Sequence, residues 1–319
     1  MNWKEGKMKE LYFINKDDPD WKDKYLLERK KGIGASDVAA VCDCSPFGSS
    51  LSVWYDKKTK EIIQQEDNIA MDLGTFLEPF LANKFVKQFK KFYNFDVELK
   101  EMPYILAYDK NDIYRCTLDR YFYDQTGIFV PVELKSTSEY RKDDWAGEEM
   151  PKFYYYQVQW QIFVTGTARA FVGFLIGNRT FDIKVVPRND KVIDMLVERV
   201  NNFWYSFVVP GIAPAPDGSA SAQEIINLLN PLETTGKTFI VNEGNIKQLR
   251  TMVSEYDSCN DIKKDNEAKM TKIRQQFAMM MGDAEEMVVD GRKIDFKTIN
   301  KHVSAYDSTY RTVMIRPKK

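Results

Sequence analysis

Alternating apolar and polar residues mark two stretches in the middle of the chain, separated by a turn at residues 124–127. Asp119 ends the first stretch, and Glu133 and Lys135 lie two residues apart in the second. Because residues i and i+2 of a strand point to the same face, Glu133 and Lys135 share one face and their apolar neighbours take the other. The turn can close a hairpin, which predicts that Asp119 lies beside Glu133.

Two carboxylates and one lysine at a single point have the chemistry of a site for Mg²⁺ or Mn²⁺. Carboxylate oxygens are the ligands that these cations prefer, and the lysine places a positive charge beside the water that the metal binds. The same residue types are also common on solvated strand faces, and this loose spacing often arises by chance. An exposed, charged strand face therefore stays open as the alternative at this point.

Apolar residues recur at helical spacing on both sides of this hairpin in the chain, and further strand patterns follow it. Because helical and strand patterns alternate along the chain, we expect an α/β fold. The expected helices cover residues 20–30, 50–60, 70–91, 151–164 and 190–208. The other expected strands cover residues 97–99, 104–107, 168–176 and 180–186.

Two polar residues on the expected helices, Glu78 and Gln157, are further candidates for the site. Glu78 lies next to the apolar stripe of helix 70–91, either as a rim glutamate or as a third carboxylate of the metal site. Gln157 and Gln161 lie one turn apart on the helix that Pro151 opens. Because Gln157 is embedded among aromatic residues, it requires hydrogen-bond partners, which favours a positioning role over that of a surface amide.

The segment Gly32-Ile33-Gly34-Ala35-Ser36-Asp37 leads into a short helix, for which Ser36 is the expected N-cap. Glycines before a helix expose backbone N–H groups that favour an anion. Arg29 lies seven residues upstream and adds a positive charge. The segment therefore predicts either a phosphate pocket or a plain glycine-containing turn.

Composition narrows the classes of function. The chain has 319 residues, 44% of them hydrophobic and 29% charged, which is typical of a soluble globular protein. The formal net charge is −1, so any surface that binds phosphates must be a local patch. The only histidine is His302, which argues against a Ser-His-Asp or Cys-His hydrolase. We find no apolar run that predicts a membrane span and no signal-peptide core, and we expect a cytoplasmic protein.

The proline- and glycine-rich segment 210–218 predicts a boundary between two domains, residues 1–216 and 217–319. The second domain contains a charged helical stretch over about residues 243–281. This stretch is expected to be a single long helix or a helical hairpin bent near Cys259. A small β-hairpin around Asp290-Gly291 follows, and a last strand is expected over residues 310–316.

Several of these motifs occur in the order typical of one family. The chain resembles the YqaJ-type viral recombinases, which are related to phage lambda exonuclease and belong to the PD-(D/E)xK nuclease superfamily. The resemblance covers roughly residues 25 to 210. The motifs that carry it are Arg29 with 32–37, Gly74-x-x-x-Glu78-Pro79, Asp119, Glu133-x-Lys135, Pro151 with 156–159, and Val164-Thr165-Gly166.

The resemblance implies a fold and a metal site. The fold is a mixed central β-sheet flanked by helices, a restriction-endonuclease-like nuclease core, here with a C-terminal helical arm and a small hairpin. Asp119, Glu133 and the carbonyl of Leu134 are the implied ligands of Mg²⁺ or Mn²⁺. Lys135 is implied to orient or activate the attacking water.

Further roles follow from the resemblance alone. Glu78 completes the acidic cluster from its helix, and Gln157 holds the lysine and the water in place. Arg29, Ser36 and Thr117 receive the terminal 5′-phosphate of the DNA.

The implied activity is metal-dependent 5′→3′ digestion of double-stranded DNA ends, which leaves 3′ single-stranded tails for an annealing protein. Relatives form rings, so a homo-oligomer, specifically a trimer, is also implied. An end-independent endonuclease of the same superfamily and a non-catalytic DNA-binding or assembly protein are the alternatives. The chain departs from the family at Arg120, where many relatives have glycine after the aspartate, and this side chain is expected to point to the opposite strand face or to the DNA backbone.

Overall fold

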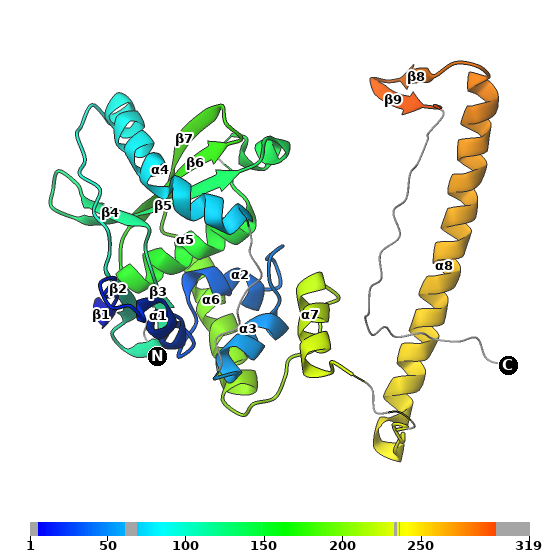
Figure 1. Ribbon diagram of the computed structural model, residues 1–319, viewed down its shortest axis with the longest axis horizontal. Helices are drawn as coiled ribbons and strands as arrows, with labels where there is room; N and C mark the ends of the chain where they lie inside the picture. Colours follow the sequence, from blue (N-terminus) through cyan, green and yellow to red (C-terminus); the bar gives the residue numbers. More distant parts are fainter. Residues whose placement is uncertain (1–5, 61–68, 148, 233–234, 236, 298–319) are drawn as a thin grey trace. The chain divides into compact units, whose positions relative to one another are not determined.

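The structure is a computed structural model that describes residues 6–60, 69–147, 149–232, 235 and 237–297. The chain forms two units, Met1–Leu229 and Asn230–Lys319. The first unit contains β1 (Met8–Phe13), α1 (Trp21–Arg29), α2 (Ala35–Val41), α3 (Ser50–Lys58), α4 (Ile69–Tyr93), β2 (Tyr104–Tyr108), β3 (Asn111–Cys116), β4 (Arg120–Tyr123), β5 (Phe129–Thr137), the 3₁₀ helix η2 (Glu139–Trp145), α5 (Lys152–Thr165), β6 (Arg169–Ile176), β7 (Thr180–Pro187), α6 (Asp190–Phe203), the π-helical segment η3 (Trp204–Val208) and α7 (Ala220–Leu229) (Figure 1).

The central sheet has the strand order β4-β5-β6-β7. Strands β5 and β6 run parallel, and the two outer pairs are antiparallel. The predicted fold class, a mixed sheet flanked by helices, is confirmed. A second, antiparallel sheet with the order β1-β2-β3 was not expected. Residues 97–99, expected as a strand, are not one, and only an isolated bridge joins Lys100 to Tyr121.

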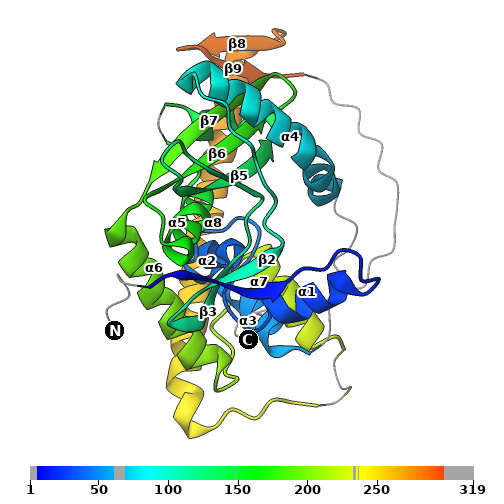
Figure 2. The ribbon, with the colours of Figure 1, turned by 90° about the vertical axis from the view of Figure 1, so that its left-hand side faces the viewer.

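Helix α4 covers one face of the central sheet. Its buried residues Leu81, Phe85 and Phe89 recur every four positions, so they form one stripe along the helix. This stripe packs on the apolar side chains of β4 to β6, including Val132 and Leu134. Helix α5 lies on the opposite side of the sheet from α4, as Figure 2 shows.

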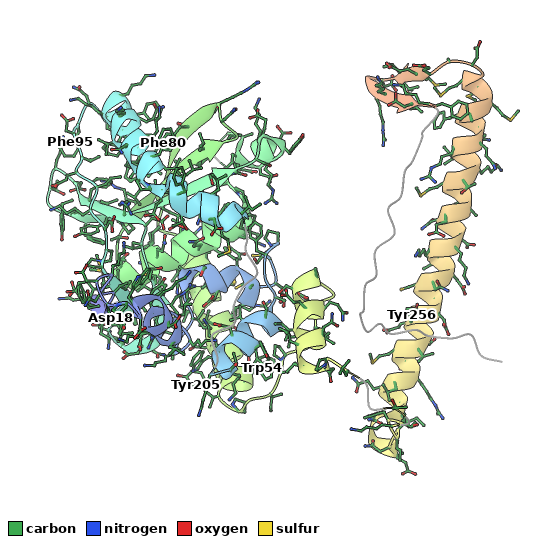
Figure 3. The ribbon with its side chains drawn as sticks, in the orientation of Figure 1. Asp18, Trp54, Phe80, Phe95, Tyr205 and Tyr256 are labelled. Atoms are coloured by element: carbon green, nitrogen blue, oxygen red, sulfur yellow. The ribbon has the colours of Figure 1, made fainter. Side chains whose placement is uncertain are left out.

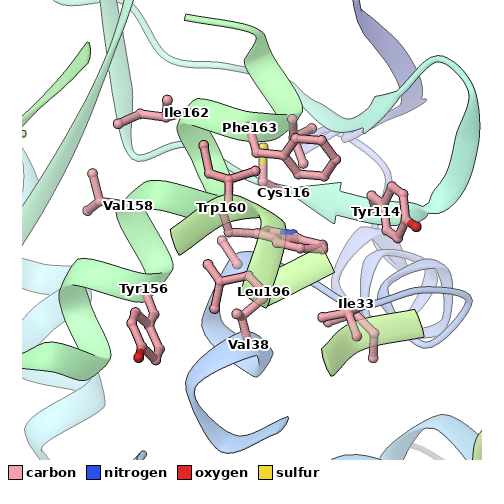
Figure 4. Close-up of a cluster of buried hydrophobic side chains, with 14 of the residues drawn as sticks. Ile33, Val38, Tyr114, Cys116, Tyr156, Val158, Trp160, Ile162, Phe163 and Leu196 are labelled. Atoms are coloured by element: carbon pink, nitrogen blue, oxygen red, sulfur yellow. The ribbon is translucent and has the colours of Figure 1, made fainter. Parts of the chain in front are cut away.

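Helix α5 forms the centre of the larger hydrophobic core. Trp160 is fully buried, and its ring lies 5.5 Å from that of Tyr114 on β3, centroid to centroid. The indole Nε1 donates a hydrogen bond of 3.0 Å to the carbonyl of Arg115. Figure 4 shows these rings packed with side chains of α2 and α6, so α5 ties both sheets to the surrounding helices.

Glycine is required at position 173 of β6, where α4 approaches the sheet closely. A Cβ atom there would lie 2.9 Å from the Phe85 ring and 3.1 Å from the Leu134 side chain. Both distances are shorter than ordinary van der Waals contact, so the missing side chain allows the helix to approach.

The boundary between the two units lies after Leu229, not after residue 216 as the proline-rich segment predicted. Helix α7 follows that segment but packs on α3, because Ala222 and Ile225 are buried together with Leu51. The Ser221 hydroxyl also lies 3.2 Å from that of Ser49. A proline- and glycine-rich linker therefore ends the regular structure without ending the unit.

The second unit consists of α8 (Glu243–Met281) and the hairpin of β8 (Glu286–Val289) and β9 (Arg292–Asp295). Helix α8 is a single helix of 39 residues without a bend into a helical hairpin. Residues 310–316, expected as a strand, lie outside the described residues. Of the described helices, none is both long enough and apolar enough to span a membrane.

Candidate active site

Strand β5 presents Glu133 and Lys135 on the face that α5 covers. Their apolar neighbours Val132 and Leu134 pack toward α4 on the other face, as the strand period predicted. Glu133 is 2% exposed, so its carboxylate is not part of a solvated strand face. The alternative of an exposed, charged strand face is therefore wrong for this strand.

Asp119 lies beside β5 because β4 and β5 form the predicted hairpin. The turn is held by Asp124, whose Oδ1 accepts hydrogen bonds from the backbone N–H groups of Thr126 and Ile128. Asp119 directly precedes β4, in the connection from the three-stranded sheet. Its Oδ2 accepts a hydrogen bond of 2.8 Å from the backbone N–H of Leu134, next to Glu133.

The Glu133 carboxylate accepts hydrogen bonds from three side chains. Its Oε1 lies 2.5 Å from Lys135 Nζ and 2.6 Å from Gln157 Nε2. Its Oε2 lies 2.6 Å from Nε2 of Gln161. The Lys135 ammonium also lies 5.0 Å from the ring centroid of Tyr154, so strand and helix together fix its position.

The pKa values of Asp119 and Lys135 are both raised in the site. Burial and the nearby charge of Glu133 raise the pKa of Asp119 to about 7. Burial acts to lower the pKa of Lys135, but the charges of Glu133 and Asp119 outweigh it and raise this pKa overall. Lys135 is therefore an ammonium at neutral pH, which suits it to orient water or stabilise negative charge.

Glu78 lies close enough to Asp119 for its charge to contribute to the raised pKa of that carboxyl, but its own carboxylate pairs with Arg120. Its Oε1 is bound by Nη1 of Arg120, which also donates a hydrogen bond of 2.5 Å to the carbonyl of Asp119. Arg120 pairs with Val132, whose side chain faces α4, so the guanidinium turns to the opposite strand face and meets Glu78 there. Among the described residues, no three His, Cys, Asp or Glu side chains form a group that can hold a metal ion.

The oxygen atoms around Asp119 nevertheless fit a hard divalent cation. The buried carboxylate of Glu133 and the half-buried carboxylate of Asp119 repel each other, which a cation between them would relieve. In a strand, the N–H and C=O of one residue point to the same side, so the Leu134 carbonyl is directed toward Asp119, as its N–H is. Mg²⁺ is typically held by one or two carboxylates and completed by water and substrate phosphate. Asp119, Glu133 and the Leu134 carbonyl are the residues that would hold it.

Gln161 is a site residue that the sequence did not identify. Its side chain is buried, and its Nε2 contacts both Glu133 and the backbone carbonyl of Thr117, at 3.2 Å from the latter. Its Oε1 has no hydrogen-bond partner among the described residues. The spacing of one turn from Gln157 was the available signal, because that spacing places both amides on one face of α5.

The three residues predicted to receive a phosphate line one cavity. Arg29, Ser36 and Thr117 surround it, and Nη2 of Arg29 donates a hydrogen bond of 2.9 Å to the Ser36 hydroxyl. Ser36 is not the N-cap of α2, because the helix begins one residue earlier and Gly34 is its N-cap. Arg115 also lines the cavity and was not predicted.

Residue Thr117 connects this cavity to the carboxylates. It lines the cavity, and its carbonyl accepts from the same Gln161 amide that binds Glu133. Asp119 follows two residues later in the chain. The candidate phosphate pocket and the candidate metal site are therefore neighbours, held together by α5.

Comparison with known proteins finds matches to one family. Residues 24–168, which contain every site residue named above, match the model of the YqaJ-like viral recombinase domain. A Bacillus subtilis (strain 168) protein named uncharacterized protein YqaJ is 27% identical over 267 residues, which cover 83% of this chain and 79% of that protein. The resemblance inferred from the motifs is thereby confirmed.

Two solved structures are also similar. The alkaline exonuclease LHK-Exo from Laribacter hongkongensis has a TM-score of 0.48 and 18% sequence identity, over 60% of this chain and 94% of that one. A phage-related exonuclease from Haemophilus somnus 129PT has a TM-score of 0.35 and 12% identity, over 56% of this chain and 96% of that one.

Proposed function

Because residues 24–168 form a YqaJ-like viral recombinase domain, we propose that the chain is a metal-dependent exonuclease that digests double-stranded DNA ends in the 5′→3′ direction. The observation that carries the proposal is the convergence of Asp119, Glu133 and Lys135 at one point of the sheet, where Glu133 is buried and the other two are half-buried. This combination suits phosphodiester hydrolysis, because the scissile phosphate is anionic and repels an anionic nucleophile unless positive charge offsets the repulsion.

Each side chain has a defined task in the proposed reaction. Bound Mg²⁺ or Mn²⁺ would supply positive charge beside the phosphate and lower the pKa of a coordinated water. Lys135, which stays protonated, orients the attacking water and stabilises the charge that develops on the phosphate. Gln157 and Gln161 hold the carboxylate of Glu133 from the helix side, so its orientation does not depend on the lysine alone.

End recognition is assigned to the cavity of Arg29, Ser36 and Thr117. A terminal 5′-phosphate matches the chemistry of a guanidinium and a hydroxyl group. Contacts of this kind bind the backbone and carry no base sequence information, so low sequence specificity follows. The neighbouring position of this cavity supports a nuclease that starts from a terminus.

The proposed reaction also implies a DNA product and partner proteins. Digestion from 5′ ends leaves 3′ single-stranded tails, which a single-strand annealing protein would then use. The nuclease units are proposed to assemble as a ring, specifically a trimer, in the cytoplasm of a bacterial host that carries the phage or prophage. The net charge of −1 is compatible with DNA binding if basic residues gather around the DNA.

Digestion of end-labelled linear duplex DNA tests the proposal directly. Wild-type protein with Mg²⁺ should release the 5′ label before the 3′ label, and removal of Mg²⁺ with EDTA should stop both. Lys135→Ala should reduce cleavage at least about a hundredfold, as expected for loss of a charge-stabilising group. Lys191→Ala removes an exposed lysine on α6 and serves as the matched control.

Assays of the same purified protein distinguish two rival functions. Nicking of covalently closed circular DNA would identify an end-independent endonuclease. Linear duplex that is bound but left intact in the presence of Mg²⁺ would identify a non-catalytic DNA-binding protein. Full activity of Lys135→Ala would contradict the assignment of this site.

A further inference from the structure

Arg115 lies in the wall of the candidate phosphate cavity, with most of its side chain held by the fold. The residue is 6% exposed, and it lines the same cavity as Arg29 and Ser36. Its Nε donates a hydrogen bond of 2.7 Å to the carbonyl of Asp112. Its Nη1 donates to two oxygens of Glu28, the carbonyl at 2.8 Å and the carboxylate Oε1 at 3.1 Å. The protein itself therefore fixes two of the three guanidinium nitrogens.

The third nitrogen of Arg115, Nη2, is available to a ligand. It has no hydrogen-bond partner among the described residues, and it is not one of the fully buried atoms that lack a partner. Because Arg115 is almost wholly buried and lines the cavity, the cavity is where this nitrogen can meet a ligand. Arginine donates in a fixed fork that matches phosphate oxygens, so an anion is the expected ligand.

Gly32 leaves the space that the Arg115 side chain occupies. A Cβ atom on Gly32 would lie 2.7 Å from Nε and 2.8 Å from Cδ of Arg115. Backbone hydrogen bonds hold the two segments together. The N–H of Ile33 donates to the carbonyl of Ile113 at 2.7 Å, and the N–H of Arg115 donates to the carbonyl of Ile33 at 3.0 Å. The first glycine of the segment 32–37 thus makes room for a guanidinium group at the cavity.

Arg29 brings a second guanidinium group to the same cavity. Its Nη2 donates to the Ser36 hydroxyl, and the group lies 5.6 Å from the centroid of the Tyr25 ring. Among the described residues it forms no salt bridge with a carboxylate. The cavity therefore holds one arginine fixed by a glutamate and one arginine without such a partner.

Helix α3 supplies a different cation for the nearby carboxylate of Asp37. Lys57 Nζ lies 2.7 Å from Asp37 Oδ2. Trp54, labelled in Figure 3, anchors this helix, because its Nε1 donates a hydrogen bond of 3.1 Å to the carbonyl of Phe207. Arg29 is thus left without an anionic partner of its own, a role that a bound phosphate would fill.

We propose that Arg115 binds the terminal 5′-phosphate of the DNA together with Arg29, through its open Nη2. The inference rests on the proposed function, because it concerns the cavity assigned to DNA ends. A terminal phosphate monoester carries up to two negative charges, whereas an internal phosphodiester carries one and a terminal hydroxyl carries none. Two guanidinium groups in one cavity therefore favour a phosphorylated end, and Arg115 sets this preference from a fixed position.

Binding of DNA hairpins with a single open duplex end tests Arg115 without cleavage. Fluorescence anisotropy in buffer with EDTA compares a 5′-phosphorylated end with a 5′-hydroxyl end. The wild type should bind the phosphorylated end at least about tenfold more tightly. Arg115→Lys should lose most of this preference. Lysine keeps the charge and can pair with Glu28, but its one nitrogen cannot also replace Nη2 at the cavity.

Lys30→Gln is the matched control for a lost buried charge. Lys30 is 8% exposed and follows Arg29 in the chain, but it binds the carbonyl and carboxylate of Asp56 and does not line the cavity. This variant should change the affinity for both hairpins by the same factor. Thermal unfolding of both variants checks that they are folded.

A crystal structure of the wild type with the phosphorylated hairpin, grown without divalent metal, tests the contact even if Arg115→Lys does not fold. A terminal phosphate oxygen should lie within about 3.2 Å of Arg115 Nη2. A phosphate bound by Arg29 and Ser36 without Arg115 would overturn the inference.

Two results of the binding assay would also contradict it. A full preference for the phosphorylated end in folded Arg115→Lys would remove Arg115 from the site and leave the proposed exonuclease intact. Equal affinity of the wild type for both hairpins would remove the end-recognition role of the whole cavity. Cleavage of linear duplex with Mg²⁺ is a separate measurement, so failure of the nuclease assignment is distinguishable from failure of this one.

Discussion

Glu133 is the residue whose surroundings define the candidate site. Its Oε1 accepts from two donors, Lys135 and Gln157, whereas Gln161 is the one donor to its Oε2 among the described residues. A buried carboxylate is stable only when such donors compensate for the lost solvent. The three side chains therefore stabilise the fold around Glu133 as well as orienting it for chemistry.

The two glutamines should differ in their effect on stability. Gln161→Met leaves Glu133 Oε2 buried without a donor and should lower the free energy of unfolding by about 1–3 kcal/mol. Gln157→Met is the matched control and should lower it less, because Lys135 still donates to Oε1. Urea unfolding of both variants measures the difference, and equal losses would contradict the unequal division of donors.

Asp119 should make the metal-free protein less stable as the pH rises. Its carboxyl keeps a proton up to about pH 7 when folded but loses it near pH 3.8 when unfolded. Because the folded state binds more protons in this window, the free energy of unfolding falls as the pH rises from about 4 to 7. Asp119→Asn keeps an oxygen for the Leu134 N–H without the charge. It should raise the melting temperature at pH 8 more than at pH 5, in buffer with EDTA, and an equal change at both values would refute the raised pKa.

At the scale of elements, strand β5 places its candidate catalytic residues on one face and its core residues on the other. One face carries Glu133 and Lys135 toward α5, and the other packs on α4. The site therefore stays rigid only if both helices lie close to the sheet. Gly173 in the neighbouring strand is a position of close approach, because a Cβ there would lie 2.9 Å from the Phe85 ring of α4.

Gly173→Ala should destabilise the fold by about 1–3 kcal/mol, because the added methyl group overlaps Phe85 and Leu134. Gly74→Ala in α4 is the matched control, since no atom lies within 4 Å of the added Cβ. That substitution should instead stabilise the helix by roughly 0.5–1 kcal/mol. Thermal unfolding of both variants checks these signs, and a neutral Gly173→Ala would show that α4 can shift at little cost.

At the scale of the whole molecule, the first unit extends to Leu229 and includes α7. Helix α7 covers Leu51 of α3, and α3 in turn supports the charged residues behind the phosphate cavity. Lys57 of α3 lies 2.7 Å from the Asp37 carboxylate at the start of α2. The segment after the proline-rich linker therefore supports the candidate phosphate cavity from a distance.

Truncation after residue 229 should leave a folded unit that still cleaves DNA ends. Truncation after residue 216 removes α7 and exposes Leu51, so the free energy of unfolding should fall by at least about 1.5 kcal/mol relative to the longer fragment. Denaturant unfolding of the two fragments measures this difference. Equal stability of the two fragments would show that the folded unit ends at the proline-rich linker, without α7.

The amino-acid sequence by itself determined most of the elements and much of the candidate site. The period of two put Glu133 and Lys135 on one face, and the turn at residues 124–127 brought Asp119 to them. These features depend on neighbouring residues and local geometry, which a sequence pattern records directly. The helix α8 and the hairpin after it were predictable for the same reason.

Only the tertiary structure decided which distant side chains meet. It paired Glu78 with Arg120, placed Gln161 against Glu133, and joined α7 to α3 across a linker that resembled a boundary. Each of these contacts joins residues far apart in the chain, and its energy depends on packing and on competition between partners. The sequence shows an arginine next to Asp119. Its pairing with Glu78 could be recognised only once the structure gave the distance between these side chains.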